Sequence, residues 1–142
     1  MTYQEPSKSQ INSILGLFSS GKLNEAIDAI SELEKTYSGQ SLLINIKGAC
    51  NAGLGDFDKA IHYYQEAIAI DPSYSKAHFN LGSALHEIGK LEESAQSYQN
   101  SIIIDSDYPE AHNNLGNVFR ELDSVSDAII SYKKAIDIKP EY

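Results

Sequence analysis

The sequence contains no tryptophan and has only one cysteine and one methionine in its 142 residues. The single cysteine, Cys50, excludes an internal disulfide framework and any zinc site built on cysteine pairs. No apolar run approaches the roughly 18–20 residues that a membrane helix needs. The first residues also lack the basic segment and apolar stretch of a secretory signal. We therefore expect a cytoplasmic protein without a membrane partner.

Basic residues are scarce: the chain has 11 Lys and Arg but 20 Asp and Glu, so its net charge is −9. A negative field repels phosphate backbones, so we expect no nucleic-acid partner. The acidic residues are spread along the chain without a block of like charge, as on a solubilising surface. The hydrophobic share of 42% is typical of a globular chain, and the length suits one domain of ordinary size.

The chain contains an internal repeat with a period of 34 residues. The repeated residues include three tyrosines, Tyr64, Tyr98 and Tyr132, and three glycines, Gly48, Gly82 and Gly116. Such a period indicates a repeat architecture in which neighbouring units bury a shared core. We divide the chain into an N-terminal extension, 1–6, and repeats over 7–40, 41–74, 75–108 and 109–142.

Each repeat predicts two helices separated by a short turn. In the third repeat, apolar residues recur at helical spacing up to Gly89, and a second apolar stripe runs from Leu91 to Ile104. Glycine within a helix costs about 1 kcal/mol relative to alanine, so Gly82 predicts a close approach of another helix. Glycine in the turn predicts a positive φ. Asp123 replaces that turn glycine in the fourth repeat, which predicts a strained, left-handed residue there.

Two of the repeats carry a family resemblance. The residues Leu81-Gly82, Ser94, Tyr98 and Ser101, and more fully Leu115-Gly116, Ala128, Tyr132, Ala135 and Pro140, resemble the tetratricopeptide repeat (TPR). The resemblance implies an all-α fold, a right-handed α-solenoid of four TPR helix-turn-helix units whose first helices line a concave groove. The first repeat departs from the pattern with Ile14 and Ile30 in place of the glycine and tyrosine. Lys47 occupies a slot expected to be buried, and we expect its stem to lie on apolar surface.

The sequence offers little support for catalysis. It has no glycine-rich phosphate loop, no pair of histidines at metal-binding spacing on one helix and no nucleophile elbow. Cys50 lies between alanines in a predicted helix, as expected of a buried structural thiol. His78 and His112 fall in one slot of adjacent repeats, on the order of 10 Å apart, which is too far to share a metal ion. We expect no enzymatic activity, no cofactor and no metal.

Asparagine gives the strongest indication of a binding site. One position of the first helix of each repeat is asparagine in three repeats, at Asn12, Asn80 and Asn114. The preceding position is asparagine in two repeats, at Asn45 and Asn113. Asn117 follows Asn114 by about one helical turn. In the TPR arrangement these slots face the groove. A side-chain amide both donates and accepts, which suits the backbone of an extended peptide. The pattern resembles the asparagine ladder in the TPR superhelix of O-GlcNAc transferase; the alternative is a solvated polar groove without a ligand.

Other side chains are expected around the same groove, with Phe18, Glu87 and Glu121 beside the charged and aromatic candidates. The full set of candidate peptide-binding residues is Asn12, Asn45, Lys76, Phe79, Asn80, His86, Asn113, Asn114, Asn117 and Arg120. A second TPR binding mode, the carboxylate clamp for chaperone C-termini, requires basic residues at slots that here hold Ile11, Asn45, Glu110 and Asn114. Only Lys76 fits that mode, so we do not expect chaperone-tail binding.

We therefore expect a protein-interaction module that binds an extended peptide or partner segment in its groove. Two alternatives stay open. The chain could be a substrate-docking or spacer region of a larger enzyme of the glycosyltransferase, sulfotransferase or methyltransferase type, or a self-associating structural repeat. The last predicted helix carries an apolar surface, with Ile130 and Tyr132 expected on its open side and Ile129 and Ile136 facing the preceding repeats. We expect weak self-association there, end to end on an Ile11–Ile14 surface or two-fold, in a fragment of a longer protein.

Overall fold

The computed structural model describes residues 4–142, and all the regular structure in that range is helical. The helices are α1 (Lys8–Ser19), α2 (Leu23–Glu34), α3 (Ser41–Gly53), α4 (Phe57–Ile70), α5 (Ser75–Glu87), α6 (Leu91–Ile104), α7 (Pro109–Glu121) and α8 (Val125–Ile138). Each 34-residue repeat of the sequence thus holds two helices, and the all-α fold class is confirmed. None of these helices is long and apolar enough to cross a membrane.

Local sequence determines where several helices begin. Ser7 caps α1, since its hydroxyl accepts from the Gln10 amide at 3.2 Å while the Gln10 side chain accepts from the Ser7 amide at 2.8 Å. Asp56 caps α4 by accepting from the Lys59 amide at 3.2 Å. Pro109 occupies the first position of α7, where a missing amide proton costs nothing.

The turns within the helix pairs follow the predicted backbone conformation. Gly21, Gly55 and Gly89 have φ angles of 74°, 81° and 78°. Asp123 has a φ of 57° and is the one non-glycine residue with positive φ in the described part of the chain. The left-handed turn predicted at Asp123 is therefore confirmed.

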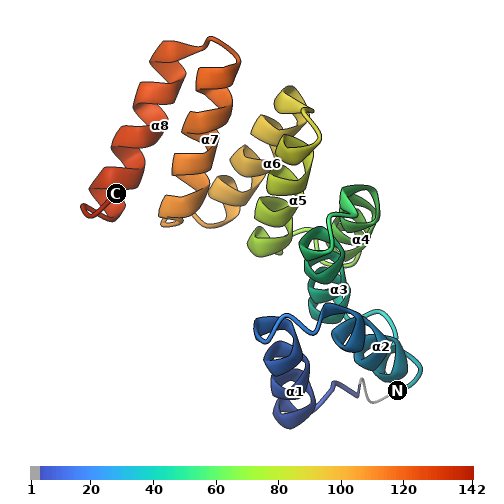
Figure 1. The fold of residues 1–142 in the computed structure, drawn as a ribbon. Coiled ribbons are helices and arrows are strands. Elements are labelled where there is room, and N and C mark those ends of the chain that lie inside the picture. Colours follow the sequence, from blue (N-terminus) through green and yellow to red (C-terminus); the bar gives the residue numbers. More distant parts are fainter. Residues whose placement is uncertain (1–3) are drawn as a thin grey trace. The chain divides into compact units, whose positions relative to one another are not determined.

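The chain forms two compact units, within Met1–Pro72 and within Ser73–Tyr142. In the first unit, α2 packs against α1 and α3, and α3 packs against α4 (Figure 1). Its core includes Ile14, Ile30, Leu43 and Cys50, all nearly inaccessible to solvent. Cys50 is thus the buried thiol that the sequence predicts, and burial raises its pKa.

Lys47 in the first unit satisfies its charge within the protein. Its side chain is only 14% exposed, and its Nζ donates to Glu34 Oε2 at 2.8 Å. The same ammonium group lies 5.2 Å from the centre of the Tyr63 ring. A lysine at a buried slot is tolerated here because an ion pair and an aromatic face both compensate its desolvation.

The second unit consists of α5 to α8, with α6 packed against both α5 and α7, and α8 against α7 (Figure 1). Its core contains Tyr98, Leu115 and Val118. The predicted close approach at glycine is present, because a Cβ at Gly82 would lie 2.9 Å from Tyr98 Cδ1 and one at Gly116 would lie 2.6 Å from Tyr132 Cε1. The repeated glycine and the repeated tyrosine are therefore two halves of one contact.

Candidate functional site

The candidate site lies in the second unit, on the surface that α5 and α7 share. We call it the α5–α7 face and define it by Asn80, Ser83, His86, Asn114 and Asn117. All five side chains are partly accessible to solvent. A pocket of about 220 Å³ on this face is lined by Ser83, His86, Glu87, Tyr98, Asn114 and Asn117.

Hydrogen bonds between helices hold the polar side chains of this pocket. The hydroxyls of Tyr98 and Ser83 are 2.9 Å apart, and Asn114 Nδ2 donates to the Tyr98 hydroxyl at 3.4 Å. The Tyr132 hydroxyl donates to Asn117 Oδ1 at 2.7 Å. The second helix of each pair thus supplies a tyrosine hydroxyl that reaches the amides of α7. These contacts orient Asn114 and Asn117 before any ligand is present.

Burial raises the pKa of Tyr98, and hydrogen bonds from Ser83 and Asn114 partly oppose this shift. The pKa of Tyr108 is also raised, chiefly by burial and then by the nearby carboxylate of Glu110. Both phenols therefore remain protonated at neutral pH. A protonated phenol donates one hydrogen bond and accepts others, so neither ring adds charge to the site.

An aromatic cluster lies at the beginning of α5. The Phe79 ring centre is 4.7 Å from that of Tyr108 and 5.6 Å from that of Tyr98. Lys76 Nζ donates to the Tyr108 hydroxyl at 3.2 Å and lies 5.1 Å from the Phe79 ring centre. The predicted candidates Lys76 and Phe79 are therefore held together, with Lys76 exposed and Phe79 half-buried.

His86 and Glu121 link the two helices of the face. His86 Nε2 and Glu121 Oε1 are 2.8 Å apart, and both side chains are substantially exposed. An exposed pair of this kind contributes little to stability. Its effect is to fix the position of an imidazole beside the pocket.

The remaining candidates are more dispersed. Asn12 on α1 and Arg120 on α7 are exposed, and Asn113 is partly exposed. Asn45 is only 5% exposed within α3, so its amide faces the protein interior. Asn45 and Asn113 occupy equivalent positions of the second and fourth repeats, but the surroundings of that position differ between the two repeats.

The surface of α8 differs from expectation in several places. Ile130 is exposed, as expected, whereas the Tyr132 ring, expected on the same open side, packs on Gly116 of α7. Ile129 and Ile136, expected to face the preceding repeats, are 47% and 45% exposed.

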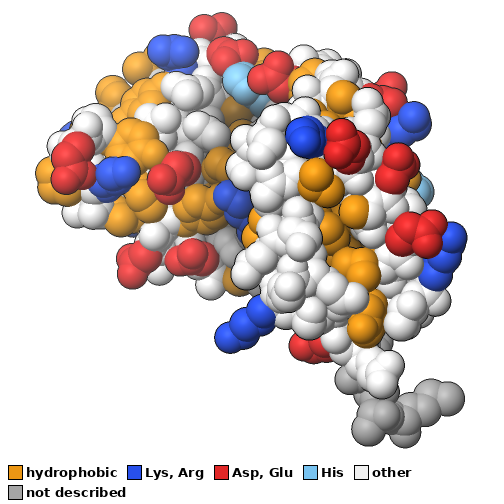
Figure 2. Space-filling view, turned by 60° about the horizontal axis from the view of Figure 1, so that its bottom comes forward, with side chains coloured by type: hydrophobic (Ala, Val, Ile, Leu, Met, Phe, Trp, Pro, Cys, Tyr) orange, Lys and Arg blue, Asp and Glu red, His pale blue; other side chains and the backbone are white. Residues whose placement is uncertain are grey.

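Ile14 of α1 is buried, so it cannot form the end-to-end surface suggested by the sequence. Figure 2 shows hydrophobic side chains gathered at the left of the view.

Sequence reasoning missed two parts of the site. Ser83 was not singled out, although it lies one helical turn after Asn80, and Tyr98 was assigned only to the core. The Tyr98 ring packs on Gly82 of α5, and its hydroxyl extends beyond that contact to Ser83 and Asn114 on the α5–α7 face. The spacing of apolar residues shows that the ring is buried but not where the hydroxyl lies. Across residues 4–142, no group of three or more His, Cys, Asp or Glu side chains is placed to hold a metal ion.

Comparison with protein families identifies the repeat. A family model described as TPR repeat matches residues 53–89 and 82–123, and a tetratricopeptide repeat model matches residues 109–142. The chain belongs to the tetratricopeptide repeat family. The resemblance inferred from Gly82, Tyr98 and their counterparts is therefore confirmed. No curated protein matches the chain.

Solved TPR structures share the fold at low sequence identity. A crystal structure of MamA has a TM-score of 0.85 and 20% identity and covers 94% of this chain and 78% of its own. YrrB, described as a TPR protein with an unusual peptide-binding site, has a TM-score of 0.80 and 21% identity over 94% of this chain and 69% of its own. The first TPR of Spaghetti (RPAP3), bound to the HSP90 peptide SRMEEVD, has a TM-score of 0.78 and 24% identity over 87% and 99%. These similarities establish a common fold.

Proposed function

We propose that this TPR chain is a protein-interaction module that binds an extended peptide segment on the α5–α7 face, without catalysing a reaction. The observation that carries the proposal is the pair of oriented amides, Asn114 and Asn117, beside a pocket of about 220 Å³. Amide, hydroxyl and imidazole groups line this pocket together. Such a mixture of donors and acceptors suits a peptide backbone of varied sequence.

The geometry of the two amides supports this proposal. Asn117 Oδ1 already accepts from Tyr132, so its Nδ2 is the group that faces a ligand as a donor. Asn114 Nδ2 makes a long contact of 3.4 Å with Tyr98, which leaves Oδ1 as an acceptor. An extended peptide presents both C=O and N–H groups along its length. One donor and one acceptor on the same helix therefore match one C=O and one N–H group of such a backbone.

The neighbouring structures support a peptide as the class of ligand. YrrB is described as having a peptide-binding site, and the RPAP3 domain was solved with an HSP90 peptide. The ligand proposed here differs from a chaperone C-terminus, because Glu110 and Asn114 occupy slots that the carboxylate clamp fills with basic residues. A terminal carboxylate would also be repelled by the carboxylates of Glu87 and Glu121 beside the pocket.

The test is peptide selection followed by a double substitution. Peptides of about 12 residues are selected from a random library against the wild-type chain, and their affinity is measured by calorimetry. Each lost hydrogen bond is worth about 0.5–1.5 kcal/mol, so Asn114→Ala with Asn117→Ala should weaken binding about five- to 150-fold. Asn100→Ala, on α6 with only an exposed contact to Gln96, is the matched control and should leave affinity unchanged.

Two outcomes would contradict the proposal. Selection that enriches no peptide against the wild-type chain would argue against peptide binding. Equal affinity of the double variant and the wild-type chain, with the helical spectrum intact in both, would exclude the asparagines as the binding groups.

A further inference from the structure

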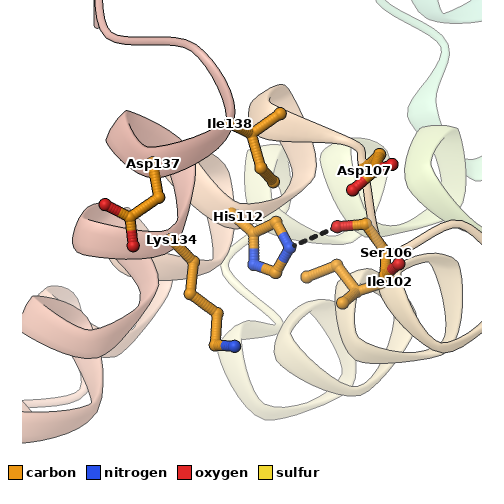
Figure 3. Close-up of a pocket in the computed structure, with 7 residues that line it drawn as sticks. All are labelled: Ile102, Ser106, Asp107, His112, Lys134, Asp137 and Ile138. Carbon is orange, nitrogen blue, oxygen red and sulfur yellow. Dashed lines mark hydrogen bonds between the residues drawn. The ribbon is translucent and has the colours of Figure 1, made fainter.

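A second pocket in the same unit lies between α6, α7 and α8, and none of its residues belongs to the α5–α7 face. Its volume is about 380 Å³, and its lining residues are Ile102, Ser106, Asp107, His112, Lys134, Asp137 and Ile138. Ligand pockets typically span about 300–1,000 Å³, so the space suits a small ligand or one partner side chain. Figure 3 shows the His112 ring in the middle of this lining, between the side chains of Ile102 and Ile138.

His112 is the buried polar group of the pocket. The residue is only 5% exposed, and its Nε2 lies 3.0 Å from the carbonyl oxygen of Ser106. A carbonyl only accepts, so Nε2 carries the proton and Nδ1 of the neutral ring is an acceptor. Among the described residues, Nδ1 has no hydrogen-bond partner. Every fully enclosed side-chain nitrogen or oxygen of these residues does have a partner, so Nδ1 is not fully enclosed. It faces the pocket (Figure 3).

Charged side chains surround the His112 ring on two sides. Figure 3 shows Lys134 and Asp137 of α8 on the side that Nδ1 faces, and Asp107 on the opposite side. None of the three forms an ion pair with another residue in the described range 4–142. Two carboxylates and one ammonium leave the pocket with a net negative charge, in a chain that carries −9 overall.

We propose that this pocket binds a primary alkylammonium group, from a free amine or a lysine side chain. The aliphatic stem packs against the apolar lining of Ile102 and Ile138 beside the His112 ring, and the ammonium group donates to His112 Nδ1 and to the Asp137 carboxylate. An ammonium has three donors and no acceptor, which matches these two acceptors. Asp107 adds attraction from the other side of the pocket, and Lys134 is the one group that opposes a cation.

The first experiment is an NMR titration of the full chain with n-hexylammonium. Amide signals of Ser106, His112 and Asp137 should shift saturably, and the Nδ1 resonance of His112 should move as it accepts a hydrogen bond. Hexanol and hexanoate have the same stem without the positive charge and should bind more weakly. Shifts of equal size with either of these compounds, or no saturable shift with n-hexylammonium, would overturn the proposal.

Substitutions on α8 give effects of opposite sign. Asp137→Asn should weaken n-hexylammonium binding about two- to fivefold, the size expected for one exposed charge pair. Lys134→Gln should strengthen binding by a similar factor, because it removes the opposing cation. Asp127→Asn, an exposed acid in the first turn of the same helix, is the matched control and should have no effect. Weaker binding by the Lys134→Gln variant would contradict the proposed cation site.

A peptide arm distinguishes the two sources of the ammonium group. Acetyl-Gly-Lys-Gly-amide is compared with the same peptide carrying norleucine, which has a similar stem without the charge. Binding of the lysine peptide at the same amides identifies a partner side chain, whereas binding of n-hexylammonium alone identifies a free amine. Asn114→Ala should leave either binding unchanged, so this proposal stands or fails independently of peptide binding on the α5–α7 face.

Discussion

At the scale of single residues, the turn between α7 and α8 carries a local strain. Asp123 has a φ of 57°, whereas the corresponding turns of the second and third repeats have Gly55 and Gly89 at 81° and 78°. The left-handed conformation brings the Cβ of an L-residue close to its following carbonyl oxygen, and aspartate tolerates this better than most residues. The hydrogen bond from the Ser124 amide to the Phe119 carbonyl, at 2.8 Å, closes the turn nonetheless.

Asp123→Gly should stabilise the protein. Removing the Cβ relieves the left-handed strain, and the expected gain in unfolding free energy is about 0.5–1 kcal/mol. Urea unfolding followed by circular dichroism measures the change, with a rise in the midpoint as the expected result.

The reciprocal change in the preceding turn is the control. A Cβ at Gly89 would meet no atom within 4 Å, so Gly89→Asp tests the backbone angle without a steric clash. It should lower the unfolding free energy by about the same 0.5–1 kcal/mol. A loss of stability in Asp123→Gly would instead mean that the Asp123 carboxylate contributes more than its backbone costs.

At the scale of helices, the contact of glycine with tyrosine sets how closely each pair packs. A Cβ at Gly48 would lie 2.7 Å from Tyr64 Cε1, and the same geometry recurs at Gly82 and Gly116. Non-bonded carbon atoms do not pack at such distances, so any larger residue must displace the ring or separate the helices. The cost of a mid-helix glycine is thus offset by a shorter distance between helices.

Gly116→Ala should destabilise the fourth repeat by about 1–3 kcal/mol, the typical cost of overpacking. Gly16→Ala, in the interior of α1, is the control because its Cβ would meet nothing within 4 Å. That variant should gain up to about 1 kcal/mol from helix propensity. Urea unfolding measures both changes, and a Gly116→Ala variant as stable as wild type would show that Tyr132 moves aside without loss.

The buried tyrosines of these contacts should make the protein sensitive to alkali. Burial raises the pKa of Tyr64 and of Tyr98 above the ordinary value near 10. Above about pH 10 the unfolded chain releases these protons before the folded chain does, so stability falls as pH rises. The limiting slope is about 1.4 kcal/mol per pH unit for each tyrosine.

Urea unfolding at pH 9, 10 and 11 tests this dependence. Tyr98→Phe should show a shallower decline with pH than wild type, whatever stability it loses with the hydrogen bond to Ser83. An unchanged slope in that variant would mean that Tyr98 ionises as readily in the folded state as in the unfolded one.

At the scale of the whole molecule, α8 presents an apolar surface to solvent. Val125, Ile129 and Ile136 are 62%, 47% and 45% exposed. Their counterparts one repeat earlier are Leu91, Ala95 and Ile102, which pack in the core of the second unit. The surface of α8 therefore has the chemistry of a helix-packing face on which no helix of residues 4–142 packs, and we propose that a second copy of the chain covers it.

Light scattering over a hundredfold range of concentration tests this self-association. The average mass should rise with concentration, because burial of apolar area gains about 25 cal/mol per Å² while association entropy opposes it. Ile129→Lys should keep the chain monomeric, and Ile130→Lys should have a smaller effect. Ile103→Lys on α6 is the control, since Ile103 is 79% exposed outside this face. A wild-type chain that stays monomeric throughout would refute the proposal.

The sequence by itself determined the period of 34 residues, the two helices of each repeat, the left-handed Asp123 and the contact at Gly82. These features depend on local backbone preference or on a packing contact that every repeat renews, so spacing alone reveals them. The family followed from the same residues.

Only the tertiary structure decided which side chains of equivalent slots are accessible. Asn45 and Asn113 share a slot, yet Asn45 is buried and Asn113 is partly exposed. The tyrosine hydroxyls that orient Asn114 and Asn117 come from the second helices, and the pocket around His112 joins three helices. Each of these depends on neighbours outside the helix that carries the residue. A period in the sequence repeats the slot, but the surroundings of that slot change from one repeat to the next.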